Sequence, residues 1–235
     1  MSDDFTAALD ALERSGHLSE RYSQPFVALL PVTGASVSTL GGILGSETLS
    51  ASDVHAARLD EVQFDLGEGP CWDALRSAKP VAEPSLQTDG AGRWPAFAAA
   101  VRDQPVSSVF AFPLIVGPLK LGAVDLYSRD PVELDATDSQ RASALAAIVG
   151  RHVLRSALEA SAPAAGGDTN PRSRRTIHQA TGVVLAQLGI GPEDALLMIQ
   201  GHAFASERSM MDIADEIVEG RLAFRSRHGR IEVGP

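Results

Sequence analysis

Residues 172–224 read RSRRTIHQATGVVLAQLGIGPEDALLMIQGHAFASERSMMDIADEIVEGRLAF and carry the pattern of consecutive short helices. The first helix is predicted from about Ser173 to Leu188, where apolar residues such as Ile177 and Val184 recur at helical spacing. A Gly-Ile-Gly break follows it directly. The stretch therefore begins with one amphipathic helix that has a defined end.

A second helix is expected to begin at Pro192, because proline is favoured at the first helical position, and to end near Phe204. Ser209, with Asp212 three residues later, is typical of a helix N-cap and predicts a third helix. Three helices in so short a stretch can enclose a core only if they pack closely. We therefore expect a compact helical domain with small residues between its helices.

Two features of the first helix need more than packing to explain them. Gly182 is predicted to lie mid-helix, where glycine costs about 1 kcal/mol relative to alanine, so another helix or a ligand should approach that face closely. Cations also crowd the helix start, where the helix dipole disfavours them. They are Arg172, Arg174, Arg175 and His178. From composition alone, this cluster is either a solvated face after a linker or a binding surface.

Four motifs of this stretch together resemble the ANTAR domain: residues 177–184 (IHQATGVV), 193–195 (EDA), 208–209 (RS) and 213–218 (IADEIV). The resemblance implies a three-helix module of bacterial transcription antiterminators, which binds paired RNA stem-loops in nascent leader transcripts. Thr181 departs from the family, which often has lysine there. The RNA-binding residues expected on this basis are Arg172, Arg174, Arg175, His178, Ala180, Thr181, Gly182, Arg208 and Ser209.

The net charge of the 235-residue chain, −10, at first argues against nucleic-acid binding. Its distribution weakens that objection. From Asp168 onward the chain has eight Arg and nine acidic residues, a net charge of −1, so the part before Asp168 carries the remaining −9. Because phosphate affinity depends on local patches, a near-neutral helical domain can still bind RNA.

One cysteine excludes an internal disulfide and agrees with a reducing cytoplasm. The acidic N-terminus lacks the features of a signal peptide, and no apolar run reaches membrane-spanning length. No His, Asp and Glu cluster has metal-ligand spacing. We therefore expect a cytoplasmic protein with no membrane contact and no metal site.

The first half of the chain alternates strand and helix patterns. Residues 35–40 alternate apolar and polar side chains, which is a strand pattern, and further strands are expected at residues 46–51 and 80–83. Residues 106–116 and 119–127 look like a long antiparallel pair joined through Gly117-Pro118. Asp135 is expected to cap a long helix that reaches about Ala160. An acidic cluster that includes Asp60 and Glu68 is interpreted as a solvated face.

The run FDLGEGPC at residues 64–71 and the paired strands FAFPL (110–114) and GAVDLY (122–127) resemble a GAF domain. That resemblance implies a six-stranded antiparallel sheet with flanking helices and a small-molecule pocket on one face; the family's ligands vary, so the ligand and any cofactor stay open. A GAF domain followed by an ANTAR domain resembles actinobacterial sensor-antiterminators. The residues expected to line the pocket are Gly67, Glu68, Gly69, Pro70, Cys71, Trp94 and Phe97.

Cys71 allows two interpretations. At a helix start its thiol could act as a redox switch, a cofactor anchor or the nucleophile of a GAF-type thiol enzyme. A single cysteine between Pro70 and Trp72 is more often a small buried hydrophobe, and the chain holds no second cysteine to resolve an oxidised thiol. We therefore expect no enzyme activity.

The sequence thus predicts an α+β fold, a GAF-like antiparallel sheet flanked by helices and followed by a small three-helix domain. Its predicted function is a signal-responsive RNA-binding antiterminator. The alternatives are a DNA-binding regulator and a thiol enzyme acting through Cys71. The long helix ending near Ala160 is apolar on two sides, which favours a homodimer. The predicted parts are an N-terminal helix (1–17), a sensor domain (18–160), a linker (161–171), the RNA-binding domain (172–226) and a tail (227–235).

Overall fold

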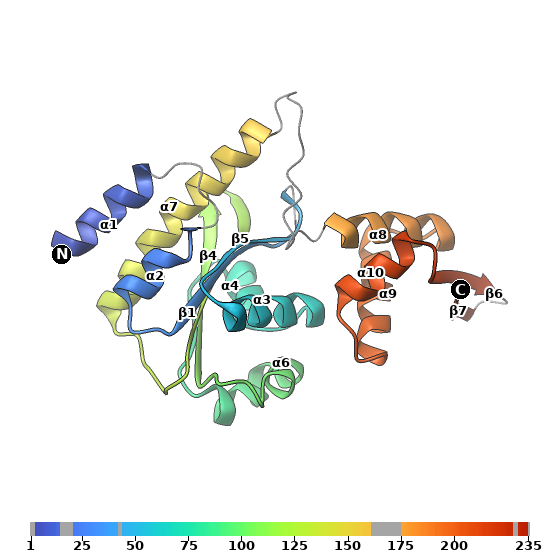
Figure 1. The fold of residues 1–235 in the computed structure, drawn as a ribbon, viewed down its shortest axis with the longest axis horizontal. Coiled ribbons are helices and arrows are strands. Elements are labelled where there is room, and N and C mark those ends of the chain that lie inside the picture. The colour runs from blue at the N-terminus through green and yellow to red at the C-terminus, as the bar shows by residue number, and fades with distance from the viewer. Residues whose placement is uncertain (1–2, 15–20, 42–43, 161–174, 228–229, 235) are drawn as a thin grey trace. The chain divides into compact units, whose positions relative to one another are not determined.

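The computed structural model of the protein describes residues 3–14, 21–41, 44–160, 175–227 and 230–234 (Figure 1). The chain divides into two compact units, Met1–Arg172 and Ser173–Pro235. Each unit has its own core. Among the described residues, no single helix is long and apolar enough to cross a membrane, although Thr176–Leu188 and Pro192–Ala205, bent by 106°, satisfy the length and composition criteria as a pair.

The first unit is built on a five-stranded antiparallel sheet with the order β2-β1-β5-β4-β3. The resemblance implied six strands, whereas the described part of the unit contributes five. The predicted pair at residues 106–127 is confirmed, with a turn at Gly117-Pro118. The strands are β1 (Gly34–Thr39), β2 (Glu47–Ala51), β3 (Val81–Glu83), β4 (Ser108–Val116) and β5 (Leu119–Ser128).

One face of the sheet is covered by α1 (Asp3–Arg14), α2 (Gln24–Leu29) and α7 (Ala136–Ala160), which lie together in Figure 1. The main-chain N–H of Asp138 donates to Asp135 Oδ1 at 2.7 Å, so Asp135 caps the long helix as predicted. Side chains such as Phe26, Phe110 and Leu145 fill this core.

The other face is covered by α3 (Val54–Leu66), α4 (Pro70–Ser77) and α6 (Pro95–Ala100) (Figure 1). A π-helical turn at Leu86–Gly90 and the short α5 (Ala91–Arg93) lead into α6. Because helices cover both faces, β1 is buried along its whole length, including its serines. Asp60 of α3 is also buried and accepts hydrogen bonds from Ser38 Oγ, at 2.6 Å, and from Thr48 Oγ1, so the interpretation of Asp60 as part of a solvated face is wrong.

The second unit contains the three predicted helices: α8 (Arg175–Leu188), α9 (Pro192–Ala205) and α10 (Met210–Val218). Ser209 caps α10, because its Oγ accepts from the Asp212 main-chain N–H at 3.1 Å. Small and aliphatic side chains fill the space between the helices: Ile177, Ala180, Val184, Ala195, Ile199, Ala203, Met210, Ile213, Ala214 and Ile217.

The predicted tail is wrong in one respect. An antiparallel hairpin of β6 (Ala223–Arg227) and β7 (Arg230–Gly234) follows α10 and takes up most of residues 227–235. It is anchored by Phe224, whose buried ring meets His202 edge-on and whose main-chain N–H donates to Gln187 Oε1 at 2.8 Å. One aromatic anchor gives these short polar strands a fixed place on the helices.

Candidate functional site

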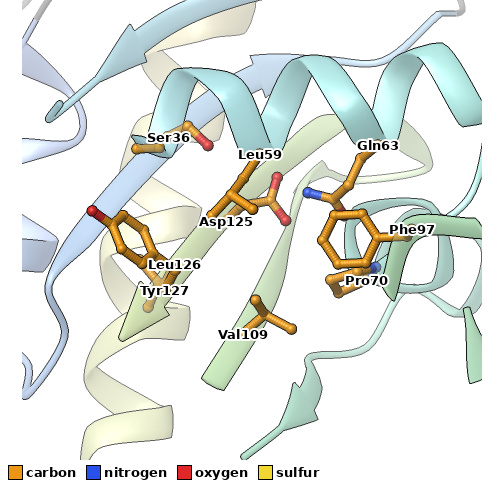
Figure 2. Close-up of a pocket in the computed structure, with 10 residues that line it drawn as sticks. Ser36, Leu59, Gln63, Pro70, Phe97, Val109, Asp125, Leu126 and Tyr127 are labelled. Carbon is orange, nitrogen blue, oxygen red and sulfur yellow. The ribbon is translucent and has the colours of Figure 1, made fainter. Parts of the chain in front are cut away.

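A small cavity lies between α3 and the sheet of the first unit (Figure 2). Its volume is about 10 Å³, enough for about one water molecule. A larger ligand therefore requires side chains to move. The cavity is lined by Ser36, Ala56, Leu59, Gln63, Pro70, Phe97, Val109, Asp125, Leu126 and Tyr127.

The sheet supplies the polar wall of this cavity. Ser36 of β1 and Asp125 of β5 are register partners, and their side chains are 1% and 7% exposed. Within the described part of the chain, Ser36 Oγ has no hydrogen-bond partner. Figure 2 shows the side-chain amide of Gln63 and the carboxylate of Asp125 pointing toward one another. The wall can therefore both donate to and accept from a small polar guest.

The Gly-Glu-Gly-Pro loop fixes the opposite wall. Gly67 ends α3 in the left-handed conformation, and Gly69 has φ +136°. A Cβ on Gly69 would lie 2.6 Å from Gln63 Oε1, which accepts the Cys71 main-chain N–H at 2.9 Å. Glu68 Oε1 accepts from the Phe97 main-chain N–H at 2.9 Å. The loop therefore joins α3, α4 and α6 and requires glycine at position 69.

The predicted pocket residues divide into two groups. Pro70 and Phe97 line the cavity. The remaining five do not line it and lie next in sequence to residues that do, or within three residues of them: Gly67, Glu68, Gly69, Cys71 and Trp94. Trp94 is buried, its Nε1 donates to Asp73 Oδ2 at 3.0 Å, and the Arg93 guanidinium lies 4.2 Å from the centre of its ring.

Sequence analysis missed the polar wall. Ser36 and Asp125 are separated by about half of the unit's length, and only the pairing of β1 with β5 brings them together. A usable signal was present in the carboxylate of Asp125 in the middle of the otherwise apolar run 122–127. A charged residue at the centre of a buried strand is uncommon unless it has a partner or a function.

Tyr127 borders the cavity, and its hydroxyl donates to Asp53 Oδ1 at 3.0 Å. Burial, together with this hydrogen bond and the charge of Asp53, raises the pKa of Tyr127 from 10.0 to about 12. Burial alone would raise the pKa of Asp53, but hydrogen bonds from Ala56, Ser52, Tyr127 and His55 outweigh it and lower that pKa. The pair ties the start of α3 to β5.

The Cys71 thiol is fully buried. A nucleophilic thiol has to reach its substrate, so the burial of Cys71 disfavours the thiol-enzyme alternative. Among the described residues, no group of three or more His, Cys, Asp or Glu side chains is placed to hold a metal ion.

In the second unit, Gly182 lies on the exposed side of α8. A Cβ built at this position meets no atom within 4 Å outside the surrounding backbone of α8, so no neighbouring helix of the second unit approaches that face. Thr181 is half-buried, and its hydroxyl donates to the Ile177 main-chain carbonyl at 2.7 Å. Ala180 is fully buried between the helices, so its predicted contact with RNA is corrected: its methyl group belongs to the core.

The other predicted RNA-binding residues fall into three groups. His178 is exposed on α8, near Gly182. Arg208 is also exposed and forms a two-pronged ion pair with Glu216, at 3.1 and 3.0 Å, while Ser209 serves as the cap of α10. Arg172 and Arg174 lie outside the described residues, as does the side chain of Arg175, the first residue of α8.

Solved structures share the fold of the first unit. The GAF domain of a phosphoenolpyruvate-protein phosphotransferase from Acinetobacter is 10% identical, with a TM-score of 0.51, and the match covers 70% of this chain and 100% of the other. The corresponding GAF domain from Coxiella burnetii is 13% identical, with a TM-score of 0.50, and the match covers 67% and 93%. At these identities the likeness shows the fold alone.

No curated protein matches the chain. Two family models do: the ANTAR domain matches residues 169–218, and the GAF domain matches residues 5–153. GAF and ANTAR are regulatory domains, and their combination identifies a signal-responsive regulator. Because the GAF match spans well over half of the 235 residues, and the ANTAR match follows it, the chain belongs to the GAF family as a GAF-ANTAR domain protein.

Proposed function

We propose that this protein is an RNA-binding transcription antiterminator whose second unit binds paired stem-loops in nascent transcripts. The input is a small molecule or a partner recognised by the GAF unit. The proposal assigns no catalytic step to the chain. It places RNA on the exposed side of α8, around Gly182 and His178, with Arg208 and Ser209 as a second contact region.

The observation that carries the proposal is the ANTAR match over residues 169–218; the open space at Gly182, inside the motif at residues 177–184, marks the surface that we assign to RNA. A glycine inside a helix costs about 1 kcal/mol relative to alanine, and close packing within the protein is the usual compensation. Here no atom lies within 4 Å of a Cβ built on Gly182. Binding of an RNA loop accounts for the glycine. Without a side chain at position 182, an unpaired base or a sugar can approach the backbone of α8 directly.

The cavity beside Ser36 and Asp125 supports a sensing role for the GAF unit. It has a buried polar wall and an apolar wall, the usual make-up of a small-molecule site. Because its volume is about that of one water, a larger ligand has to displace side chains when it enters. Such a change in packing is the physical origin of the signal in this proposal.

Gly182→Leu tests the RNA surface directly. We expect the variant to keep its fold, because the added side chain meets open space, and to lose RNA binding. Gly201→Leu is the matched control: Gly201 is an equally exposed helical glycine of α9 with no atom within 4 Å of a built Cβ. Gly182→Ala should raise the stability of the helical unit by about 1 kcal/mol.

RNA affinity and thermal unfolding are measured side by side for these variants. The RNA comes from crosslinking and sequencing of transcripts bound to the wild-type chain in its native cell, and paired stem-loops in leader regions are the expected targets. Retained RNA binding by Gly182→Leu would contradict the proposed surface. So would simultaneous loss of binding and of the helical fold, because that result makes Gly182 a packing residue. Enrichment of double-stranded DNA in place of RNA would favour the alternative DNA-binding regulator.

A further inference from the structure

The hairpin β6–β7 lies beyond the ANTAR family match, which ends at residue 218. It nevertheless has a fixed place in the second unit. β6 packs on α8, and the hydrogen bond from the Phe224 main-chain N–H to Gln187 joins the two elements. The hairpin is therefore an ordered addition to the three helices, on the same helix that carries Gly182.

Its charge sets it apart from the rest of the chain. Residues 220–235 contain four Arg and one Glu, a net charge of +3, while the whole chain carries −10. The arginines are Arg221, Arg225, Arg227 and Arg230. Arg221 forms an ion pair with Glu219, so the surplus of positive charge rests with the hairpin itself, which has three arginines and Glu232 and a net charge of +2.

The register of the hairpin separates its two faces. Phe224 is opposite Val233 and Ser226 is opposite Ile231, whereas Arg225 is opposite Glu232. Since successive residues of a strand alternate between faces, positions 225, 227 and 230 share the face opposite to that of the buried Phe224. The anchored face thus has mostly apolar positions, with Ser226 among them, and the other face has three arginine positions and Glu232. We call this second face the basic face. Arg225 is exposed.

Arg227 is the register partner of Arg230. The backbone register thus places two arginine positions directly opposite one another, where like charges are in general unfavourable. A polyanion that binds the basic face would offset the repulsion between like charges at these positions. Phosphate groups of nucleic acid are such a polyanion, and arginine binds them through two parallel hydrogen bonds.

We propose that the basic face of the hairpin, positions 225, 227 and 230, contacts the RNA backbone and extends the RNA surface of the ANTAR domain. This inference rests on the proposed function. Backbone contacts position the RNA without reading its sequence, so the hairpin contributes affinity, while the face of α8 around Gly182 contributes selectivity. RNA is favoured over a protein partner for the basic face because three of the four charged residues at its positions are arginines. The opposite face is anchored by Phe224, and its Ile231 and Val233 stay 45% and 38% exposed.

Three variants of the full chain test this assignment. Arg225→Ala/Arg227→Ala/Arg230→Ala removes the basic face, and the corresponding triple lysine variant keeps its charge. The control, Arg21→Ala/Arg58→Ala/Arg102→Ala, removes three exposed arginines of the first unit and lowers the net charge by the same amount. The probes are a pool of RNA stem-loops with randomised loops and single-stranded poly(U). Affinity is measured over a range of salt concentrations, with circular dichroism as the test of folding.

Each phosphate contact contributes about 0.7–0.9 to the slope of log affinity against log salt concentration. Loss of three contacts should therefore lower the slope by about 2 and weaken binding at least tenfold at physiological salt. The lysine variant should keep the wild-type slope, and the control should bind as wild type.

Several results would overturn the inference. One is an alanine variant that binds with wild-type affinity and slope, and another is a control that loses as much affinity as the alanine variant. Failure of the lysine variant to keep the slope would show that the substitutions act through the fold. If the wild-type chain binds RNA and the alanine variant binds equally well, only the role of the hairpin is refuted. If the wild-type chain binds neither probe, both the proposed function and the role of the hairpin are refuted.

Discussion

Replacing Asp60 by alanine should destabilise the GAF unit strongly. Asp60 is 0% exposed and lies where α3 crosses β1 and β2. Its carboxylate accepts hydrogen bonds from Ser38 Oγ and Thr48 Oγ1, so one side chain joins a helix to two strands. Removing it leaves two buried hydroxyl groups without this acceptor and opens a polar gap between the layers.

The magnitude follows from those two hydroxyls. A buried donor that loses its partner costs about 1–3 kcal/mol, so two of them give about 2–6 kcal/mol, and we expect about 3 kcal/mol for Asp60→Ala. With an m-value of about 2 kcal/mol/M, this lowers the urea midpoint by about 1.5 M. Asp60→Asn, which keeps one acceptor oxygen and nearly the same volume, should lose less.

Tryptophan fluorescence is a selective assay, because both tryptophans of the chain, Trp72 and Trp94, lie in the first unit. Urea unfolding is followed for the wild type, Asp60→Ala, Asp60→Asn and the donor variant Ser38→Ala. A midpoint shift of less than about 0.5 M for Asp60→Ala, equivalent to about 1 kcal/mol, would refute the reasoning. An equal loss for Asp60→Asn and Asp60→Ala would also refute it, since the acceptor would then be irrelevant.

Two further predictions concern pH and assembly. The pKa of Tyr127 is raised to about 12, so the native state holds this proton more tightly than the unfolded chain does; its contribution to stability is complete below pH 10 and is lost as the pH rises toward 12. Urea midpoints measured from pH 9 to 12 should fall less steeply for Tyr127→Phe than for the wild type, and equal slopes would contradict the assignment. The protein should form a homodimer through α7, where Leu158 is 66% exposed. Light scattering should give a dimer for the wild type and a smaller mass for Leu158→Glu, whereas a wild-type monomer at micromolar concentration would disprove the prediction.

Local signals in the sequence were sufficient for much of the fold. The caps at Asp135 and Ser209 depend on side chains within three residues of the groups they bind, and both are present as predicted. The β4–β5 pair depends on one short turn. The three helices of the second unit are predicted from the spacing of their apolar residues, which is a property of each helix alone.

Features that depend on distant pairing were not accessible in this way. Asp60 looked like one more acid in a charged cluster, and only the crossing of α3 over β1 shows it to be buried. Ser36 and Asp125 become neighbours through the strand register. The hairpin at the C-terminus was missed because its strands are short and polar, and its position depends on the contacts of Phe224 with Gln187 and His202. Ala180 was assigned to the RNA-binding surface because a small side chain fits a close contact with RNA as well as it fits a contact between helices.

The edges of the five-stranded sheet bear on how this protein behaves at high concentration. The edge strands are β2, with five residues, and β3, with three, while the long strands β4 and β5 lie inside. An edge strand offers unpaired N–H and C=O groups to any other chain, and a short edge limits how many hydrogen bonds an intruding strand can form. The described five-stranded sheet thus offers other chains only short edges on which to add a strand.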